Sequence, residues 1–229
     1  MKRSDATTAA TIGLRESKKA RTRQQISNVA TRMFIERGFE QVTVAEIAAA
    51  ADVSVKTVFN YFPAKEDLFF DRADELIDGV TRTIEQRPAG TTVLGALHEL
   101  LACNFQPFRN TGWGMLRDPE AYEAVRAFMA TERSSPALRA RRLVLAEAWM
   151  AALAQTLGRE LGVRADDPRA STLAAMLVAA ASLRQRELWD SVLSGLSART
   201  VERRVRTVVD EAFARLEHGF ADIDREAVR

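Results

Sequence analysis

The chain has 229 residues, 47% of them hydrophobic and 28% charged, which is enough for one large domain or two small ones around a buried core. Its single cysteine, Cys103, excludes an intrachain disulfide and therefore the framework of a small disulfide-rich secreted protein. No apolar run reaches the ~18 to 20 residues of a membrane helix, and residues 1–17 lack the apolar region of a signal peptide. We therefore expect a cytoplasmic protein without membrane partners, in which Cys103 is a small core residue.

The charge is unevenly distributed along the chain. Residues 1–32 carry eight Lys or Arg against Asp5 and Glu16, a net +6, whereas the formal net charge of the whole chain is only +2. A basic end on a mildly acidic body is the arrangement of a protein that presents one end to a polyanion. A solvated basic tail is the alternative, and the charge by itself does not separate the two.

Helical periodicity, with Pro and Gly at the boundaries, predicts an all-α protein of about nine helices without a convincing strand. A long amphipathic helix over 18–37 ends at Gly38, and two short helices follow over 44–51 and 55–61. A fourth helix is predicted over 64–87, before a Pro-Ala-Gly break. Further helices are expected over 92–106, 119–132, 136–161, 168–194 and 199–220, with an irregular segment over 108–117.

This order of elements predicts two domains. Residues 1–17 would be a flexible basic N-terminal tail, and residues 18–63 a small three-helix domain. Residues 64–229 would then form the larger helical domain. The small domain holds the more informative pattern.

Two helix starts with a tight turn between them define that pattern. Thr43 and Glu46 form a capping box, so a helix begins at Val44. Ser54 is the N-cap of a second helix, which Pro63 prevents from continuing. Two short helices after a long amphipathic one are typical of a helix-turn-helix, whose second helix enters the major groove of DNA.

The second helix has an inner and an outer face. Val58 and Phe62 lie four residues apart, so they share a face and should pack inward. Lys65 lies in the first turn of the next helix, where its charge opposes the helix dipole, so we expect a phosphate as its partner. A solvated polar surface is the alternative for each outward residue. The side chains left to donate to phosphates or read base edges are Lys56, Thr57, Asn60 and Tyr61.

The same residues resemble the signature of the TetR/AcrR family of transcriptional regulators over about 18–70. The match rests on Gly38, Phe39, Thr43, Val44, Ile47, Ala48, Val53, Ser54, Thr57, Tyr61, Phe62, Pro63, Lys65, Glu66 and Leu68. Phe59 stands where the family commonly has Tyr, which leaves open whether its ring contacts a phosphate or packs. The resemblance implies double-stranded DNA with a pseudo-palindromic operator as partner, contacted by Thr43, Ser54, Lys56, Thr57, Asn60, Tyr61 and Lys65.

By the same resemblance, the last two long helices would pair with those of a second copy to make a homodimer. Both carry wide apolar faces, which on the last helix include Val205 and Val209. Such faces exceed what a lone helix hides on one side, so an interface is a reasonable interpretation, with burial inside the monomer as the alternative.

Members of the family receive small molecules among their middle helices, so we expect an apolar or amphipathic effector of unknown identity. Residues 87–97 resemble a subset described as binding acyl-CoA-like ligands. A buried, hydrogen-bonded histidine and ordinary core aromatics are the alternatives to a pocket. Arg184 and Arg186 could make interface ion pairs or meet an anionic ligand. The candidate ligand-binding residues are His98, Phe105, Trp113, Phe128, Trp149 and Met176.

Enzyme chemistry finds no support in the sequence. There is no G-x-S-x-G, phosphate loop, dinucleotide fingerprint or H-E-x-x-H, and there are only two histidines. We expect no enzyme, no cofactor and no metal site. The predicted function is a ligand-responsive DNA-binding regulator, a repressor that an effector releases from its operator, since repression is the family's commoner mode. A ligand-independent DNA-binding protein with a degenerate pocket is the alternative.

Overall fold

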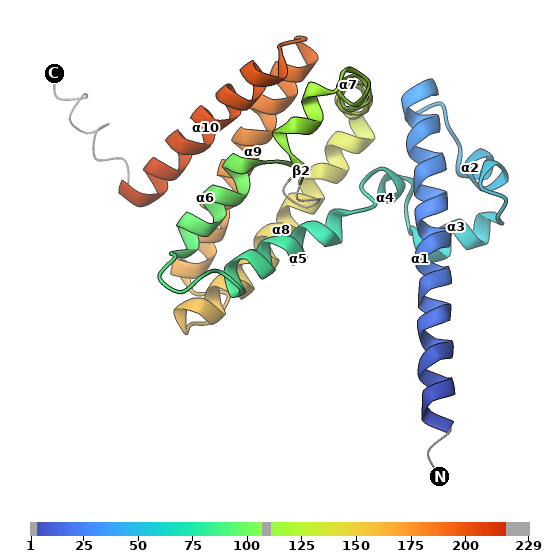
Figure 1. The fold of residues 1–229 in the computed structure, drawn as a ribbon, viewed down its shortest axis with the longest axis horizontal. Helices are drawn as coiled ribbons and strands as arrows, with labels where there is room; N and C mark the ends of the chain where they lie inside the picture. The colour runs from blue at the N-terminus through green and yellow to red at the C-terminus, as the bar shows by residue number, and fades with distance from the viewer. Residues whose placement is uncertain (1–3, 107–110, 219–229) are drawn as a thin grey trace. The chain divides into compact units, whose positions relative to one another are not determined.

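The computed structural model describes residues 4–106 and 111–218 (Figure 1). Over these residues it contains ten α-helices, a short 3-10 helix and one pair of very short strands, which confirms the all-α class. The elements are α1 (Ser4–Arg37), α2 (Val44–Ala50), α3 (Val55–Tyr61), α4 (Lys65–Phe69), α5 (Ala73–Glu85), α6 (Val93–Cys103), β1 (Asn104–Gln106), β2 (Thr111–Gly112), η1 (Trp113–Arg117), α7 (Pro119–Ser134), α8 (Pro136–Leu161), α9 (Pro168–Leu193) and α10 (Ala198–His218). Within the described residues no helix is long and apolar enough to cross a membrane.

The chain divides into two compact units. The first comprises Met1–Asp71 and Thr131–Arg139, and the second comprises Arg72–Ala130 and Ala140–Arg229. The first unit therefore contains α1 to α4 together with the corner between α7 and α8. The predicted small domain ended at residue 63. The first unit differs from it by including α4 and the corner between α7 and α8.

α1 is the longest helix of the first unit, and α2 and α4 pack against its C-terminal half (Figure 1). The ring of Phe34 lies 4.8 Å from that of Phe39 and 6.3 Å from that of Phe69, an aromatic cluster that joins α1, the turn between α1 and α2, and α4. α1 begins at Ser4, whereas residues 1–17 were expected to be a flexible tail. The alanines in this segment have high intrinsic helix propensity, which favours continuation of the helix.

The helix boundaries of the predicted motif follow local chemistry. The Glu46 amide donates to Thr43 Oγ1 at 3.2 Å, and the Thr43 amide donates to Glu46 Oε2 at 2.8 Å, so the predicted capping box is confirmed. Ser54 Oγ accepts from the Thr57 amide at 3.0 Å, which confirms the second N-cap. Gly38 has a φ of 84°, the left-handed conformation expected of a glycine that ends a helix.

The single helix predicted over 64–87 is wrong, because residues 70–72 interrupt it between α4 and α5. The guanidinium of Arg23 donates to the backbone carbonyl of Asp71, and Ser27 Oγ donates to the carboxylate of Asp71 at 2.5 Å. Both contacts come from side chains more than forty residues away in the sequence, and they hold Asp71 within the break.

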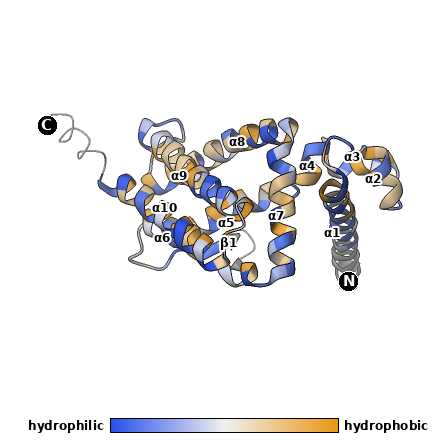
Figure 2. Ribbon diagram, turned by 90° about the horizontal axis from the view of Figure 1, so that it is seen from above, coloured by the Kyte–Doolittle hydropathy of each residue, from blue (hydrophilic) through white to orange (hydrophobic). Residues whose placement is uncertain are grey.

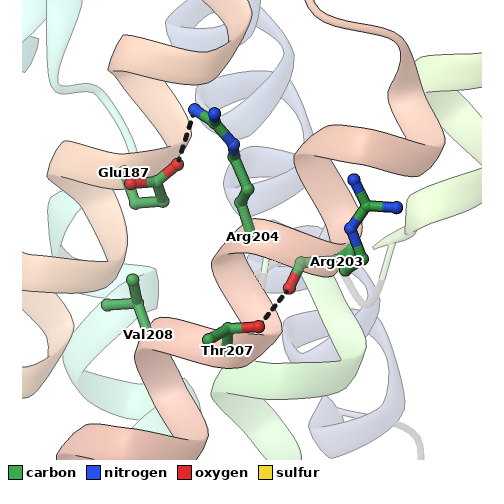
Figure 3. Close-up of a pocket in the computed structure, with 5 residues that line it drawn as sticks. All are labelled: Glu187, Arg203, Arg204, Thr207 and Val208. Atoms are coloured by element: carbon green, nitrogen blue, oxygen red, sulfur yellow. Dashed lines mark hydrogen bonds and ion pairs between the residues drawn. The ribbon is translucent and has the colours of Figure 1, made fainter.

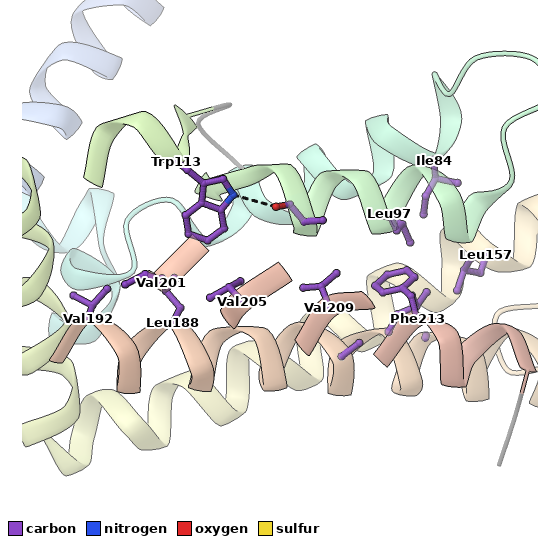
Figure 4. Close-up of a cluster of buried hydrophobic side chains, with 14 of the residues drawn as sticks. Ile84, Leu97, Trp113, Leu157, Leu188, Val192, Val201, Val205, Val209 and Phe213 are labelled. Atoms are coloured by element: carbon purple, nitrogen blue, oxygen red, sulfur yellow. Dashed lines mark hydrogen bonds between the residues drawn. The ribbon is translucent and has the colours of Figure 1, made fainter. Parts of the chain in front are cut away.

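In the second unit α10 packs against α9 and α6, and α5 packs against α6. One residue per turn of α10 is buried, with at most 2% of its surface exposed, and Figure 4 shows this row within the core cluster. The apolar face of α10 is thus covered by the chain's own helices, so the interface interpretation of Val205 and Val209 is wrong and their burial in the monomer is correct. The row consists of Val201, Val205, Val209 and Phe213.

The predicted helix over 92–106 ends early, at Cys103, because the next three residues form β1, which pairs with β2. Arg184 on α9 is buried, and its Nε donates to the Leu101 carbonyl at 2.8 Å. Its Nη2 donates to the carbonyl of Asn104, the C-cap of α6. Burial lowers the pKa of Arg184 to about 10, so it remains a cation near neutral pH and suits the negative end of the α6 dipole.

Cys103 is exposed, so the expectation of a core cysteine is wrong. Its thiol donates to Glu99 Oε2 at 3.1 Å. This hydrogen bond and partial burial raise the pKa of the thiol, the opposite of what a reactive cysteine needs.

The middle of α8 is loosely packed compared with α9 and α10. Residues 140–153, all of them described, include no fully buried side chain. Leu143 and Val144 expose 69% and 52% of their surface, and α8 shows orange, hydrophobic stretches in Figure 2. The guanidinium of Arg142 lies 4.8 Å from the centre of the Trp189 ring on α9.

Candidate functional site

The outward face of α3 is the centre of the candidate site. Val58 and Phe62 are buried, as predicted, and fix this seven-residue helix to the first unit. Lys56 and Asn60 are exposed, while Thr57 and Tyr61 are half-buried. A short helix with its apolar residues turned inward thus presents an ammonium and an amide to solvent, the groups that donate to phosphates and base edges.

Two apolar side chains on the same helix also face solvent. Val55 exposes 41% of its surface and Phe59 exposes 46%, so the Phe59 ring does not pack inward. Apolar groups on a reading helix can contact the thymine methyl group in the major groove. Val55 was not among the predicted contact residues, because apolar side chains are usually assigned to the core. The available signal was the four-residue spacing from Val55 to Phe59, which places both off the inward stripe.

Thr43 and Ser54, predicted to contact DNA, stand at the N-termini of α2 and α3. Both hydroxyls accept the cap hydrogen bond of their helix, and Ser54 Oγ also lies 2.8 Å from Thr57 Oγ1. Hydrogen bonds from Arg37 and Thr43 lower the pKa of Glu46 to about 2. Glu46 is therefore a carboxylate over the whole physiological pH range, and the capping box stays intact.

Lys65 has protein partners that the sequence did not reveal. Its Nζ donates to the Phe39 carbonyl at 2.5 Å and lies 4.2 Å from the centre of the Phe39 ring. Burial lowers the pKa of Lys65, and the charges of Glu40, Glu66 and Glu46 oppose this change. An ammonium has three donors, so one bond to Phe39 leaves two for a phosphate.

The basic residues of α1 divide into two groups. Arg23 is engaged within the unit, since it donates to Asp71 and lies 4.8 Å from the centre of the Phe62 ring. Lys18, Lys19 and Arg21 are exposed on the part of α1 that precedes Arg23. The excess positive charge of the N-terminal segment thus includes three accessible cations on α1 that could contact phosphates.

This chain is similar to known proteins, first of all over the helix-turn-helix. A sequence profile for bacterial regulatory proteins of the tetR family matches residues 26–71, which are the helix-turn-helix and its flanks. The HTH-type transcriptional regulator TcmR of Streptomyces glaucescens is 31% identical over 160 residues, which cover 68% of this chain and 67% of TcmR. The chain belongs to the TetR family. This TetR-family protein is accordingly a DNA-binding transcriptional regulator, and its relatives are not enzymes.

Other TetR-family proteins match shorter or more distant parts. The HTH-type transcriptional regulator LuxR of Vibrio harveyi is 45% identical over 60 residues, 26% of this chain and 27% of LuxR. The crystal structure of Thermus thermophilus FadR in complex with lauroyl-CoA shares the fold, with a TM-score of 0.50 and 24% identity over 86% of this chain and 94% of FadR. The higher identity to LuxR thus holds over a shorter segment than the match to TcmR.

The predicted ligand-binding residues of this TetR-family protein lie in different surroundings. His98 Nε2 lies 2.7 Å from Asp210 Oδ1, so α6 and α10 share a hydrogen bond there. Trp113 is buried in the core, and its indole N–H donates to the Ala102 carbonyl at 3.0 Å (Figure 4). The side chain of Phe105 lies outside the described residues. The remaining three are partly exposed: Phe128, Trp149 and Met176.

Trp149 differs from Trp113 in its hydrogen bonding. Its indole nitrogen is buried but has no acceptor among the described residues. A buried N–H without an acceptor costs about 1–3 kcal/mol. The loosely packed middle of α8 thus contains a donor that a bound molecule could satisfy.

A groove on the surface of the second unit lies between α9 and α10. It has a volume of about 280 Å³ and is lined by Glu187, Arg203, Arg204, Thr207 and Val208 (Figure 3). Arg204 Nη1 lies 3.7 Å from Glu187 Oε1 across it. The groove is open, and none of the predicted ligand-binding residues lines it.

Proposed function

We propose that this regulator binds a pseudo-palindromic operator as a homodimer and represses transcription until a small apolar or amphipathic effector releases it. The observation that carries the DNA-binding part is the outward face of α3, where polar and apolar contact groups project from a helix fixed by Val58 and Phe62. The α3 helices of the two copies must lie ~34–36 Å apart to enter successive major grooves. An effector that favours another spacing would release the DNA.

Each contact residue has a role that follows from its place. Lys56 and Asn60, fully outward on α3, would read base edges. Tyr61 and Lys65, half-buried at the edge of the helix, would bind phosphates, and Thr57 would assist from the same face. Thr43 and Ser54 would approach the DNA backbone from the N-termini of α2 and α3, which their side chains cap.

A second copy would pack on the exposed side of α9. The outward residues there are small, which permits close helix contact, and Leu183 adds an apolar side chain with 44% of its surface exposed. The groove between α9 and α10 continues this face and could receive side chains of the partner (Figure 3). The small outward residues are Thr172, Ala175, Ala179 and Ser182.

The effector would bind beside the middle of α8. Trp149 offers an N–H without an acceptor, and Trp189 offers a ring beside the guanidinium of Arg142. Burial lowers the pKa of Arg142 to about 10, which leaves it a cation near neutral pH. Apolar rings with a donor and a cation suit an amphipathic molecule that carries an acceptor or anionic group. Lauroyl-CoA, the ligand of the Thermus thermophilus structure, combines both features and is the first compound to test.

Selection from a random-sequence DNA pool would test the DNA-binding part. We expect a two-fold symmetric site that the protein prefers by at least ~10³ over unrelated DNA at physiological salt. Effector affinity would then be measured by the emission of Trp113, Trp149 and Trp189, with and without the selected duplex. Because coupling is reciprocal, a tenfold loss of operator affinity requires a tenfold loss of effector affinity on DNA. Equal effector affinities would contradict release, and no enriched site would contradict operator binding.

A further inference from the structure

The corner between α7 and α8 belongs to the DNA-binding unit, although some sixty residues separate the two in the sequence. Residues Thr131–Arg139 group with Met1–Asp71 in one compact unit. At this corner Glu132, Ser135 and Leu138 expose at most 2% of their surface. Two polar side chains on an ordinary surface turn would be solvated, so their burial means that the corner is packed against the helices of this unit.

A single hydroxyl joins the corner to the turn between α1 and α2. Ser135 Oγ donates to Glu40 Oε1 at 2.6 Å and accepts from the Leu138 amide at 3.2 Å. The second bond is the N-cap of α8, and the first is a charge-assisted bond to the α1–α2 turn. The start of α8 is therefore tied directly to Glu40.

The same turn holds the predicted phosphate ligand. Lys65 donates to the carbonyl of Phe39, the neighbour of Glu40, and Glu40 is the carboxylate that acts most strongly on the charge of Lys65. Ser135 therefore contacts Glu40, and the neighbouring residue Phe39 contacts Lys65. The two helices that meet at this corner, α7 and α8, continue into the second unit.

We infer that Ser135 and Glu40 are positioning residues for DNA binding, which hold the α1–α2 turn so that Lys65 faces the phosphate backbone. This inference rests on the proposed operator binding. A displacement of α7 or α8 that withdraws Ser135 from Glu40 weakens the phosphate contact of Lys65. The corner thus gives the second unit a connection to the DNA contacts in addition to the chain between α4 and α5.

Double-mutant cycles on the full chain test this inference, with the duplex that the wild-type protein enriches from a random-sequence pool as the probe. Ser135→Gly removes the bond to Glu40, while glycine is tolerated at N-caps. We expect about fivefold weaker binding and a salt slope reduced by up to about 1, as loss of one phosphate contact gives. Ser134→Gly, at the adjacent exposed serine, is the matched control and should change affinity by less than about twofold.

Second substitutions at Glu40 or Lys65 distinguish a positioning role of Ser135 from a local effect on the N-cap of α8. In a Glu40→Ala or a Lys65→Gln background, Ser135→Gly should cost less than about twofold, because the contacts through which it acts are absent. Ser135→Thr, which keeps the hydroxyl, should restore wild-type affinity. Equal losses of DNA affinity in the wild-type, Glu40→Ala and Lys65→Gln backgrounds would overturn the inference. Damage to the α8 cap alone would weaken binding in the same way in each of them.

A further variant serves if Ser135→Gly does not fold, which circular dichroism would report. Ser135→Asp keeps an N-cap oxygen but places a carboxylate against Glu40, so binding should weaken and Glu40→Ala should restore it. Failure of Glu40→Ala to restore binding would overturn the inference alone. A wild-type protein that enriched no duplex would overturn the proposed operator binding and this inference with it.

Discussion

α3 and α10 use their apolar residues in opposite ways. α3 has seven residues, buries Val58 within the helix and Phe62 at its C-cap, and leaves Val55 and Phe59 in solvent. α10 has 21 residues and buries one residue per turn, so that its exposed side is mostly charged. The inward side chains fix α3 and leave its other face for a partner, whereas the apolar stripe of α10 is fully used by α6 and α9. An apolar stripe therefore identifies a buried face without saying which chain buries it.

The largest effect should come from charges placed in the α10 row. Val205→Asp combined with Val209→Asp puts two carboxylates into the core, which should lower the free energy of unfolding by on the order of 5 kcal/mol or more. Circular dichroism should show loss of helix. Leu183→Asp, on the exposed side of α9, should instead leave a helical protein that sediments as a monomer. A folded Val205→Asp, Val209→Asp monomer would show that α10 is an interface helix after all.

Substitutions on the outward face of α3 should have the next largest effect. Lys56→Ala and Asn60→Ala should each cost about 1–3 kcal/mol at particular operator positions and little on unrelated DNA. Fluorescence anisotropy with single base-pair variants of the selected site measures this. Gln155→Ala, at an exposed position of α8, is the control that should leave both affinities unchanged. Equal losses of affinity for operator and unrelated DNA would show that these residues contact phosphates and do not read bases.

Neutralising the cations of α1 should have a smaller effect that does not depend on sequence. Lys18→Gln, Lys19→Gln and Arg21→Gln together should lower the slope of log affinity against log salt by up to about 3, because each phosphate contact contributes about 0.9. Specific and non-specific duplexes should change alike. Arg32→Gln, an exposed cation farther along α1, provides a comparison for the effect of charge alone. An unchanged slope would mean that these residues are a solvated surface.

The capping box should contribute the smallest effect, and one that depends on pH. The hydrogen bonds of Arg37 and Thr43 hold the pKa of Glu46 at about 2, below its ordinary value of 4.5. A lowered pKa stabilises the folded state above pH ~4.5, and this stability is lost as pH falls toward 2. The melting temperature of Glu46→Gln should therefore lie below that of wild type at pH 7, and the difference should shrink between pH 4.5 and 2. A constant difference would contradict the depressed pKa.

The sequence by itself determined the helix-turn-helix almost completely. Thr43 and Glu46 are three residues apart, and Ser54 caps the amide of Thr57. The hydrogen bonds that start each helix therefore join residues that are close in the sequence. Val58 and Phe62 are buried because their four-residue spacing fixes a common face. Such short-range signals need no knowledge of the rest of the fold. They also placed Lys56 and Asn60 outward.

Only the tertiary structure decided what depends on distant partners. Arg23 and Ser27 bind Asp71 in the break between α4 and α5, and Arg184 caps α6 from α9. The corner at Ser135 joins the DNA-binding unit through Glu40, a contact across 95 residues. A side chain's sequence position gives its face on a helix but not the element that meets that face. For this reason the periodicity of α10 could not tell a dimer interface from the core of one chain.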